Sequence, residues 1–165
     1  FLDSYHRLTH LPEPEYKTVS VPALFTKLER LLQAEPRSER VVYCDGKADR
    51  STGKELQVYG DANLLTLALI NLIRNALQAV EGQEDGIVRV DTCAGATGHL
   101  LIIITDNGPG IPPERLSAIF TPFFSTKSGG SGIGLPISQR IMQLHGGQLS
   151  VSSIPNVRTE FRMEF

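Results

Sequence analysis

The sequence predicts an α/β fold, a two-layer sandwich in which helices pack against a mixed sheet of five or more strands. Its 165 residues suit one domain of ordinary size. Hydrophobic residues at 41% and charged residues at 21% are typical of a globular protein and exclude a disordered or fibrous chain. Segments with helical apolar spacing alternate with segments of strand-like spacing, which is the pattern of a layered α/β domain.

Charge and hydrophobicity exclude two classes of function. The formal net charge is −2 and no basic face is evident, so we expect no nucleic-acid partner. The longest apolar runs, residues 67–70 and 100–104, are far shorter than the roughly 18 residues that cross a bilayer. We therefore expect a cytoplasmic domain.

The N-terminal segment differs in character from the rest of the chain. Residues 1–17 are polar and contain Pro12 and Pro14, so we expect a linker or the tail of a preceding element, followed by one domain over residues 18–165. A helix should come next, because Pro22 suits a first helical turn and apolar residues recur at helical spacing. These residues are Leu24, Phe25, Leu28, Leu31 and Leu32.

Strands and a long helix are expected in the middle of the chain. Residues 40–44 and 55–59 have strand patterns, and the polar residues 45–54 between them should form a turn. A long helix is predicted from Asp61, a favourable N-cap residue, to near Gly82.

A hairpin follows that helix. Residues 87–93 and 99–105 have strand patterns around a short loop that contains two glycines. The second strand is apolar almost throughout, so we expect it at the centre of the sheet with both of its faces covered.

The C-terminal third begins with a long irregular segment. Residues 106–131 contain one short predicted helix near residues 113–120, and loops of this length are usually functional. A helix over residues 132–145 and strands over residues 148–152 and 159–165 complete the domain. Eight of the 15 glycines fall in this third, which favours a site where a ligand approaches the main chain. They are Gly108, Gly110, Gly129, Gly130, Gly132, Gly134, Gly146 and Gly147.

Two short polar patterns are candidates for ligand binding. Asn71 and Asn75 are four residues apart and therefore share one helix face. Their amides either cap neighbouring loops or supply neutral oxygen ligands to Mg²⁺, whose remaining ligands are phosphates and water. Asp106, Gly108 and Gly110 follow the apolar strand, where they form either a simple turn or a carboxylate acceptor beside glycines that admit a flat ligand.

Two further patterns lie in the irregular segment. The first contains Phe120, Phe123 and Phe124, which form either an apolar anchor or ordinary core packing. It ends at Lys127, which either reaches a phosphate or is solvated. The second leads directly into a helix, and its glycines would expose consecutive amides that favour an anion. It consists of Gly130, Ser131, Gly132, Ile133, Gly134 and Leu135. Its spacing is neither that of a dinucleotide-binding fingerprint nor that of a Walker loop.

In their order and separations, these four patterns resemble the N box, first glycine box, F box and second glycine box of the GHKL ATP-binding superfamily. The most similar group is the catalytic domain of two-component sensor histidine kinases of the nitrogen-regulation type, and the resemblance covers residues 19–165. It implies a Bergerat-type sandwich with three helices on one face of the sheet. ATP would lie between the N-box helix and a mobile lid.

The resemblance also implies roles for individual residues, with ATP and Mg²⁺ as cofactors. Asn75 and Asn71 match the metal-binding asparagine and its partner, and with Lys127 they are the predicted catalytic residues. Asp106 matches the aspartate that binds the exocyclic amine of adenine, and Thr159 matches a threonine that supports adenine through water. The remaining predicted nucleotide-binding residues are Gly108, Gly110, Ile111, Phe120, Gly130, Ser131, Gly132, Ile133, Gly134 and Leu135.

Two positions depart from the pattern of the family. Gln78 stands where many members carry a phosphate-binding lysine, and either Arg74 or Lys127 could supply that charge instead. Arg158 precedes Thr159 where many members have glycine.

The phosphate acceptor of this family is a histidine followed by an acidic residue, and none of the four histidines here has such a neighbour. We therefore expect a fragment of a longer kinase that binds Mg-ATP and donates the γ-phosphate to a histidine of its own dimerisation domain. It should not phosphorylate itself, and it should form a homodimer only through that missing domain. A downstream response regulator is the other expected partner, and membrane attachment of the parent kinase stays open.

Three other interpretations share the same motifs. A GHKL serine kinase would use the same pocket. A gyrase-like or MutL-like ATPase would normally carry a glutamate at the position of Asn71. A binding module that has lost ATP is the third.

Overall fold

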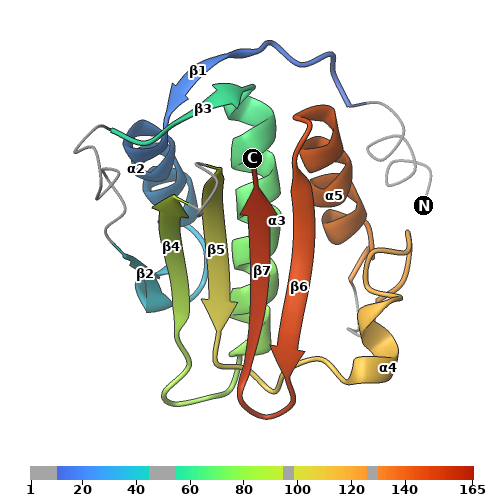
Figure 1. The fold of residues 1–165 in the computed structure, drawn as a ribbon. Coiled ribbons are helices and arrows are strands. Elements are labelled where there is room, and N and C mark those ends of the chain that lie inside the picture. The colour runs from blue at the N-terminus through green and yellow to red at the C-terminus, as the bar shows by residue number, and fades with distance from the viewer. Residues whose placement is uncertain (1–10, 45–54, 95–98, 126–129) are drawn as a thin grey trace.

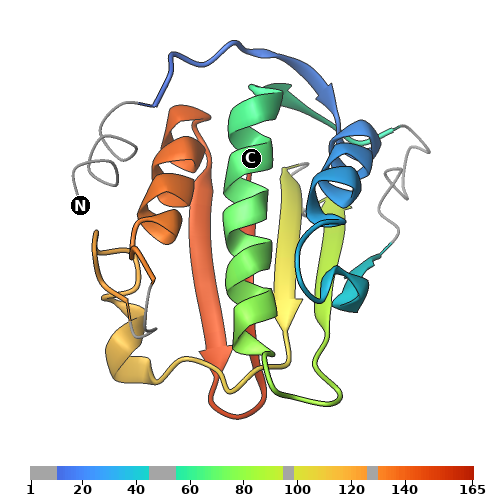
Figure 2. The same cartoon turned by 180° about the vertical axis from the view of Figure 1, so that it is seen from behind.

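The computed structural model describes residues 11–44, 55–94, 99–125 and 130–165, and these form the expected two-layer α/β sandwich (Figure 1). One layer is a mixed five-stranded sheet with the strand order β2-β4-β5-β7-β6. The other layer contains α2, α3 and α5, which cover a single face of this sheet (Figure 2). The strands are β1 (Lys17–Ser20), β2 (Val41–Tyr43), β3 (Gln57–Gly60), β4 (Val88–Ala94), β5 (Leu100–Asp106), β6 (Gln148–Ile154) and β7 (Arg158–Glu164). The helices are α2 (Val21–Leu32), the 3₁₀ turn η1 (Ser38–Arg40), α3 (Ala62–Ala79), α4 (Pro113–Leu116) and α5 (Gly134–Leu144).

The two short strands β2 and β3 exist as predicted, but they are not neighbours. β2 pairs in parallel with β4 at one edge of the large sheet, whereas β3 pairs antiparallel with β1 in a separate two-stranded sheet. The turn predicted between them falls on residues 45–54, which lie outside the described part of the chain. Alternating apolar residues indicate a strand, but they do not identify its partner.

The hydrophobic core lies between α3 and the inner face of the sheet. Nine residues of α3 are buried, and Leu65, Leu69 and Leu72 have no exposed surface. Ile102 and Ile104 of β5 face them and are at most 1% exposed. The spacing of apolar residues that predicts the helix is thus the same spacing that packs it on the sheet.

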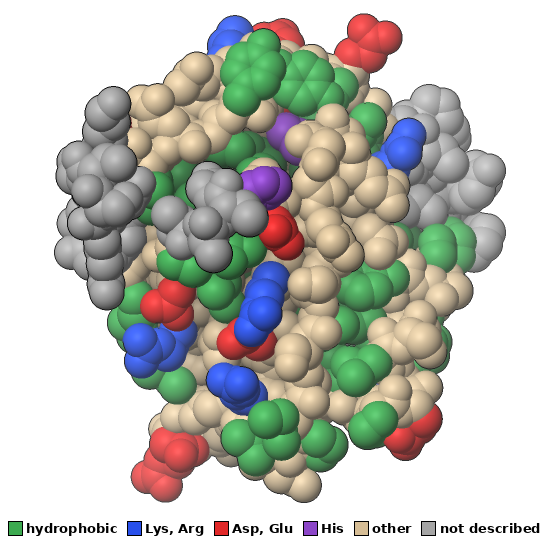
Figure 3. All heavy atoms as spheres, viewed as in Figure 1, with side chains coloured by type: hydrophobic (Ala, Val, Ile, Leu, Met, Phe, Trp, Pro, Cys, Tyr) green, Lys and Arg blue, Asp and Glu red, His purple; other side chains and the backbone are tan. Residues whose placement is uncertain are grey.

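The opposite face of the sheet carries charged side chains and no covering helix in the described structure (Figure 3). β5 is central, as predicted, but its outer residues Leu101 and Ile103 are only half-buried, so the expectation that both faces are covered is wrong. Arg162 lies opposite Ile103 and donates from Nε to Glu160 Oε1 at 2.6 Å. β5 pairs antiparallel with both of its neighbours, and an antiparallel arrangement tolerates one face toward water.

Both ends of α3 are anchored by side chains from distant parts of the chain. At the N-terminus, Asp61 Oδ1 accepts hydrogen bonds from the backbone N–H groups of Asn63 (2.8 Å) and Leu64 (3.1 Å). The Asp61 backbone N–H donates to His145 Nε2 at 2.9 Å, which links α3 to the end of α5. At the C-terminus, Arg40, the last residue of η1, donates from Nη1 to the carbonyl oxygens of Val80 (3.1 Å) and Gln83 (2.7 Å).

The short elements β1 and η1 were not predicted, whereas the remaining elements agree with the sequence in kind and differ at their ends. Ser20 caps α2, and β4 and β5 form the expected hairpin. The helix predicted near residues 113–120 is the single turn α4, and the helix predicted from residue 132 begins at Gly134. Among the residues that the structure describes, no helix has the length and hydrophobicity needed to cross a lipid bilayer.

The N-cap of α3 gives a prediction about acid stability. Burial raises the pKa of the Asp61 carboxyl, but hydrogen bonds from the backbone of Glu15, Leu64 and Asn63, with His145 nearby, outweigh it and hold this pKa below its usual value. The carboxylate therefore stabilises the fold fully above about pH 4, and this contribution disappears as the pH falls through the lower folded-state pKa.

Asp61→Asn should lower the free energy of unfolding at pH 7 by about 1 kcal/mol, because one oxygen acceptor is replaced by an NH₂ donor. It should also flatten the fall in stability below about pH 4. Urea unfolding between neutral and acidic pH measures both effects, with the exposed Asp85→Asn as the matched control. If the free energy of unfolding falls as steeply at acidic pH in Asp61→Asn as in the unaltered chain, the Asp61 carboxylate is not the source of this pH dependence.

Candidate functional site

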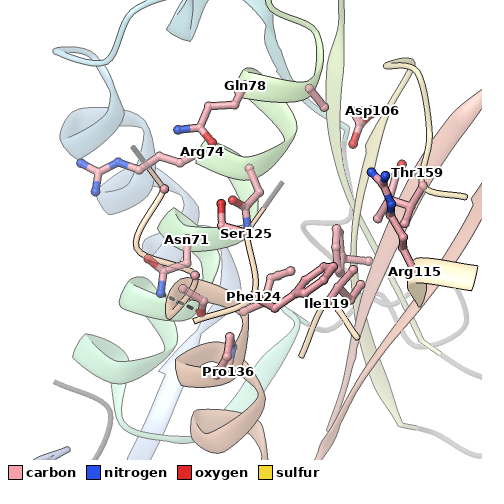
Figure 4. Close-up of a pocket in the computed structure, with 18 of the residues that line it drawn as sticks. Asn71, Arg74, Gln78, Asp106, Arg115, Ile119, Phe124, Ser125, Pro136 and Thr159 are labelled. Atoms are coloured by element: carbon pink, nitrogen blue, oxygen red, sulfur yellow. Dashed lines mark hydrogen bonds between the residues drawn. The ribbon is translucent and has the colours of Figure 1, made fainter. Parts of the chain in front are cut away.

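A cavity of about 580 Å³ opens between α3, the end of β5, α4 and the start of α5 (Figure 4). Its volume lies in the range of pockets that bind small molecules. Eleven of the predicted site residues line it: Asn71, Asn75, Asp106, Gly110, Ile111, Gly130, Ser131, Gly132, Gly134, Leu135 and Thr159. The other lining residues are Arg74, Gln78, Ala79, Pro109, Pro112, Arg115, Ile119, Phe124, Ser125, Pro136 and Phe161.

One wall of the cavity is the polar face of α3. Asn71, Arg74, Asn75 and Gln78 recur at intervals of three and four residues, so they lie along one side of the helix. Asn71 Nδ2 donates to the carbonyl oxygen of Gly134 at 3.3 Å, which joins this wall to the first turn of α5. The apolar face of α3 thus packs in the core while its polar face lines the cavity.

A buried carboxylate marks the opposite end of the cavity. Asp106 is the last residue of β5 and is 3% exposed, and its Oδ1 accepts the backbone N–H of Gly108 at 2.9 Å. Thr159 lies directly across from it on β7 and is equally buried. Burying a charged acceptor is costly unless it receives hydrogen bonds. Asp106 also lines the cavity, so this end presents a carboxylate acceptor to a ligand that carries an N–H donor.

A small hydroxyl network surrounds Thr159. Thr159 Oγ1 and Ser153 Oγ are 3.1 Å apart, and Ser153 Oγ accepts the backbone N–H of Ile111 at 2.8 Å. The network connects β6, β7 and the loop after β5. It fixes the loop residues that form the floor of the cavity at its Asp106 end.

The loop after β5 is docked on the turn between β6 and β7. Gly110 has φ +74°, and a Cβ atom there would lie 2.7 Å from the carbonyl oxygen of Ile154. The backbone N–H of Asn156 donates to the carbonyl oxygen of Pro109 at 2.8 Å. Only glycine permits this approach without moving the turn.

Asn107, for which no role was predicted, also holds this loop. Its Oδ1 accepts the backbone N–H of Ile87 at 2.8 Å, and its Nδ2 donates to the carbonyl oxygen of Asp85 at 2.9 Å. The Asn-Gly pair is thus more than a generic turn, because its side chain ties the loop to the start of β4.

The second glycine box rests on the phenylalanine segment. Gly132 has φ +65°, and a Cβ atom there would lie 2.6 Å from the carbonyl carbon of Phe123. The backbone N–H of Phe123 donates to the carbonyl oxygen of Gly132 at 2.9 Å. Phe124 then contributes to the cavity wall beside Ile119 (Figure 4). These two sequence patterns therefore form a single structural unit.

Four predicted site residues are not part of the described cavity wall. Gly108 lies behind Asp106 and against Ala79, where a Cβ atom would be 2.7 Å from Asp106 Oδ1. Ile133 is 6% exposed within the core, and Phe120 packs against the core. Lys127 lies outside the described residues.

Arg115 is a lining residue that no sequence pattern indicated. It reaches the cavity from α4, on the side where Asp106 and Thr159 lie (Figure 4). The long irregular segment and its short helix were predicted, but a one-turn helix has no apolar periodicity that shows which residues face inward.

The donor set suits a magnesium ion that a phosphate ligand brings with it. Among the described residues, no group of three or more His, Cys, Asp and Glu side chains could hold a metal by itself. The two asparagines on the α3 wall supply neutral amide groups, and Mg²⁺ is commonly held by few protein ligands together with phosphates and water. The residues present therefore fit a metal-nucleotide complex.

Comparison with known proteins connects this geometry to a family. Residues 60–165 match the model of the histidine kinase-, DNA gyrase B-, and HSP90-like ATPases. This range contains α3, both glycine-rich segments and Thr159.

Two curated relatives are sensor histidine kinases. ZraS of Salmonella typhimurium is 42% identical over 98 residues, which cover 59% of this chain and 21% of ZraS. The histidine kinase/phosphatase NtrB of Vibrio alginolyticus is 34% identical over 163 residues, which cover 93% of this chain and 45% of NtrB. The chain therefore spans less than half the length of either relative.

Solved structures show the same fold. A nucleotide-free catalytic domain of histidine kinase ThkA has a TM-score of 0.73 and 27% identity, covering 92% of this chain and 95% of that chain. ThkA in complex with the response regulator protein TrrA has a TM-score of 0.71 and 25% identity, covering 92% of this chain and 42% of that chain.

The contact between Gly132 and Phe123 gives a prediction about two glycines. Gly132→Ala should lower the free energy of unfolding by about 1 kcal/mol, because alanine is strained at a positive φ. The loss should be larger still, because the added Cβ atom forces the Phe123 backbone to move. Gly146→Ala is the matched control, since Gly146 has φ +68° and nothing within 4 Å of an added Cβ atom. Denaturant unfolding compares the two variants. Equal losses would show that Gly132 does not hold the Phe123 segment.

Proposed function

Since this chain belongs to the family of histidine kinase-, DNA gyrase B-, and HSP90-like ATPases, we propose that its cavity binds Mg-ATP and that the domain donates the γ-phosphate to a histidine of a separate dimerisation domain. The observation that carries this proposal is the convergence of the asparagine pair, Asp106 and the second glycine box on one cavity. The relatives ZraS and NtrB are named as histidine kinases, which supports the choice of a histidine as the phosphate acceptor.

Asp106 identifies the purine in this proposal. Its buried carboxylate accepts a hydrogen bond from the exocyclic amine of adenine, and Thr159 supports the base through water. Gly110 and Ile111 form the adjoining floor, which the Ser153 network holds in place. A buried carboxylate oxygen that faces the base discriminates strongly, because a base without a donor at this position loses that hydrogen bond.

The α3 wall and the second glycine box bind the phosphate end. Asn75, with Asn71 one turn earlier, would hold the metal through its amide oxygen, and the backbone from Gly130 to Leu135 would bind the phosphates. Lys127 is the proposed cation of the lid. When bound, Mg²⁺ neutralises charge on the phosphates. The work of these residues is to orient the nucleotide and stabilise its charge, as in other phosphoryl transfers.

The proposal includes partners outside this chain. Residues 18–165 form the ATP-binding unit, and residues 1–17 connect it to a dimerisation domain that carries the acceptor histidine and forms the homodimer. A response regulator receives the phosphoryl group next, in keeping with the complex of ThkA and its regulator TrrA. The signalling activity of the whole protein is thus two-component phosphotransfer.

The rival ATPase activity is disfavoured by the residue at position 71. A gyrase-like ATPase uses a glutamate there as general base, whereas Asn71 is neutral and donates its amide hydrogen to Gly134. An amide cannot accept the proton of an attacking water in the pH range of the cell.

Asp106→Asn tests the recognition of the base. It should weaken ATP binding about ten- to hundredfold, because an NH₂ group replaces a carboxylate oxygen while the other oxygen can still accept from Gly108. Calorimetry with a non-hydrolysable analogue measures the affinity. Asp91→Asn, on the open face of the sheet, is the control and should bind as the unaltered chain does. Unchanged affinity in Asp106→Asn would remove this carboxylate from base recognition.

Phosphoryl transfer is tested by mixing this chain with its own dimerisation domain and γ-labelled ATP. We expect acid-labile phosphohistidine on that domain and no label on this chain incubated alone. Acid-stable phosphoserine on a protein substrate would instead favour a serine kinase. Steady ATP turnover without an acceptor would favour an ATPase, and label on the isolated chain would overturn the expectation that it cannot phosphorylate itself.

A further inference from the structure

The cavity has few cations for a ligand as negative as a triphosphate. Of its lining residues that the structure describes, only Arg74 and Arg115 are basic, and Gln78 is neutral. Arg115 lies on the side of Asp106, away from the asparagine wall (Figure 4). Arg74 immediately precedes Asn75 on α3, so it is the described cation best placed for the phosphate end.

Arg74 is held by a partner outside the cavity. Its Nε donates to Glu35 Oε1 at 2.9 Å, and its Nη2 contacts the same oxygen. Glu35 is not a lining residue, and Figure 4 shows the Arg74 side chain extending away from Asp106 and Thr159. The guanidinium is therefore drawn toward the rim of the cavity.

The position of Glu35 is fixed by its backbone. Its N–H donates to the carbonyl oxygen of Leu32 at 2.8 Å, and its carbonyl oxygen accepts the N–H of Ser38 at 3.2 Å. The carboxylate thus projects from a hydrogen-bonded turn after α2. The long side chain of Arg74, which is 52% exposed, is free to take another rotamer without any change in α3.

Resting on the proposed binding of ATP, we propose that Arg74 is a phosphate-positioning residue and that Glu35 competes with the nucleotide for it. In the nucleotide-free chain the guanidinium pairs with Glu35. When a triphosphate enters, the guanidinium turns to the phosphate oxygens, which match its planar donors. Glu35 thereby weakens the affinity for ATP. Arg74 supplies the positive charge that a lysine supplies in relatives that carry one at the position of Gln78.

The competition has a predictable size. A partly exposed ion pair is worth a small fraction of the binding energy of a nucleotide, so removing Glu35 should tighten ATP binding about two- to fivefold. Adenosine has no phosphate, and its affinity should stay the same. The effect should also shrink at high salt, because exposed charges are screened.

A double-mutant cycle tests the proposal by calorimetry on the 165-residue chain with non-hydrolysable ATP analogue and with adenosine. Glu35→Gln keeps the size of the side chain and removes its charge, and it should tighten binding of the analogue. Arg74→Gln should weaken it. Glu35→Gln in the Arg74→Gln background should then change nothing, because the residue for which the carboxylate competes is gone.

A matched control separates this competition from general charge effects. Glu81 pairs with Arg37 at 2.9 Å and does not line the cavity, so Glu81→Gln removes a comparable surface carboxylate and should leave affinity for the analogue unchanged. The Arg74 side-chain N–H resonance in an NMR spectrum gives a second readout. It should move when the analogue is added and stay in place with adenosine.

The outcomes are distinct. If Glu35→Gln tightens binding equally with and without Arg74, simple repulsion explains the effect and the proposal is overturned. If Glu35→Gln has no effect in the unaltered background, the proposal is overturned as well. If the unaltered chain binds no ATP analogue, the proposed function fails and this proposal fails with it, whereas the two outcomes above overturn the competition alone and leave the proposed function intact.

Discussion

The packing of α3 on the sheet is the constraint on which the rest of the structure depends. Leu65, Leu69 and Leu72 have no exposed surface, and this buried face fixes the rotation of the helix about its axis. The polar face with Asn71 and Asn75 must then point to the cavity, since residues one position further along a helix are turned by about 100°. The anchors at both helix ends prevent sliding along the axis. A single apolar stripe therefore orients the asparagine wall.

The second requirement is close approach of backbone to backbone at two glycines. Gly110 brings the loop after β5 onto the β6–β7 turn, and Gly132 brings the start of the second glycine box onto Phe123. Both have positive φ and both meet main-chain atoms closer than a Cβ atom tolerates. The cavity is consequently bounded by loops docked on rigid elements. Gly110 and Gly132 therefore serve the scaffold.

Several features were predictable because they depend on neighbours in the sequence. The N-cap Asp61, the helix that follows it and the β4–β5 hairpin were confirmed. The partners of β2 and β3 were not predictable, because hydrogen bonding between strands joins segments that are distant in the chain. The same holds for Arg74, whose contact with Glu35 spans 39 residues. Arg115 escaped notice because one helical turn carries no periodicity.

The sequence alone determined the fold class and the residue types at the site, because apolar periodicity and glycine spacing are local properties of the chain. The family followed from the resemblance of its four motifs to those of a known superfamily. Tertiary structure decided which of these residues share a cavity. It brought Asp106, the α3 wall and the second glycine box to one place, and it put Gly108 and Ile133 behind the wall. It also gave Arg74 a partner from another element. Such juxtapositions follow from how the layers pack, and packing is a property of the whole core.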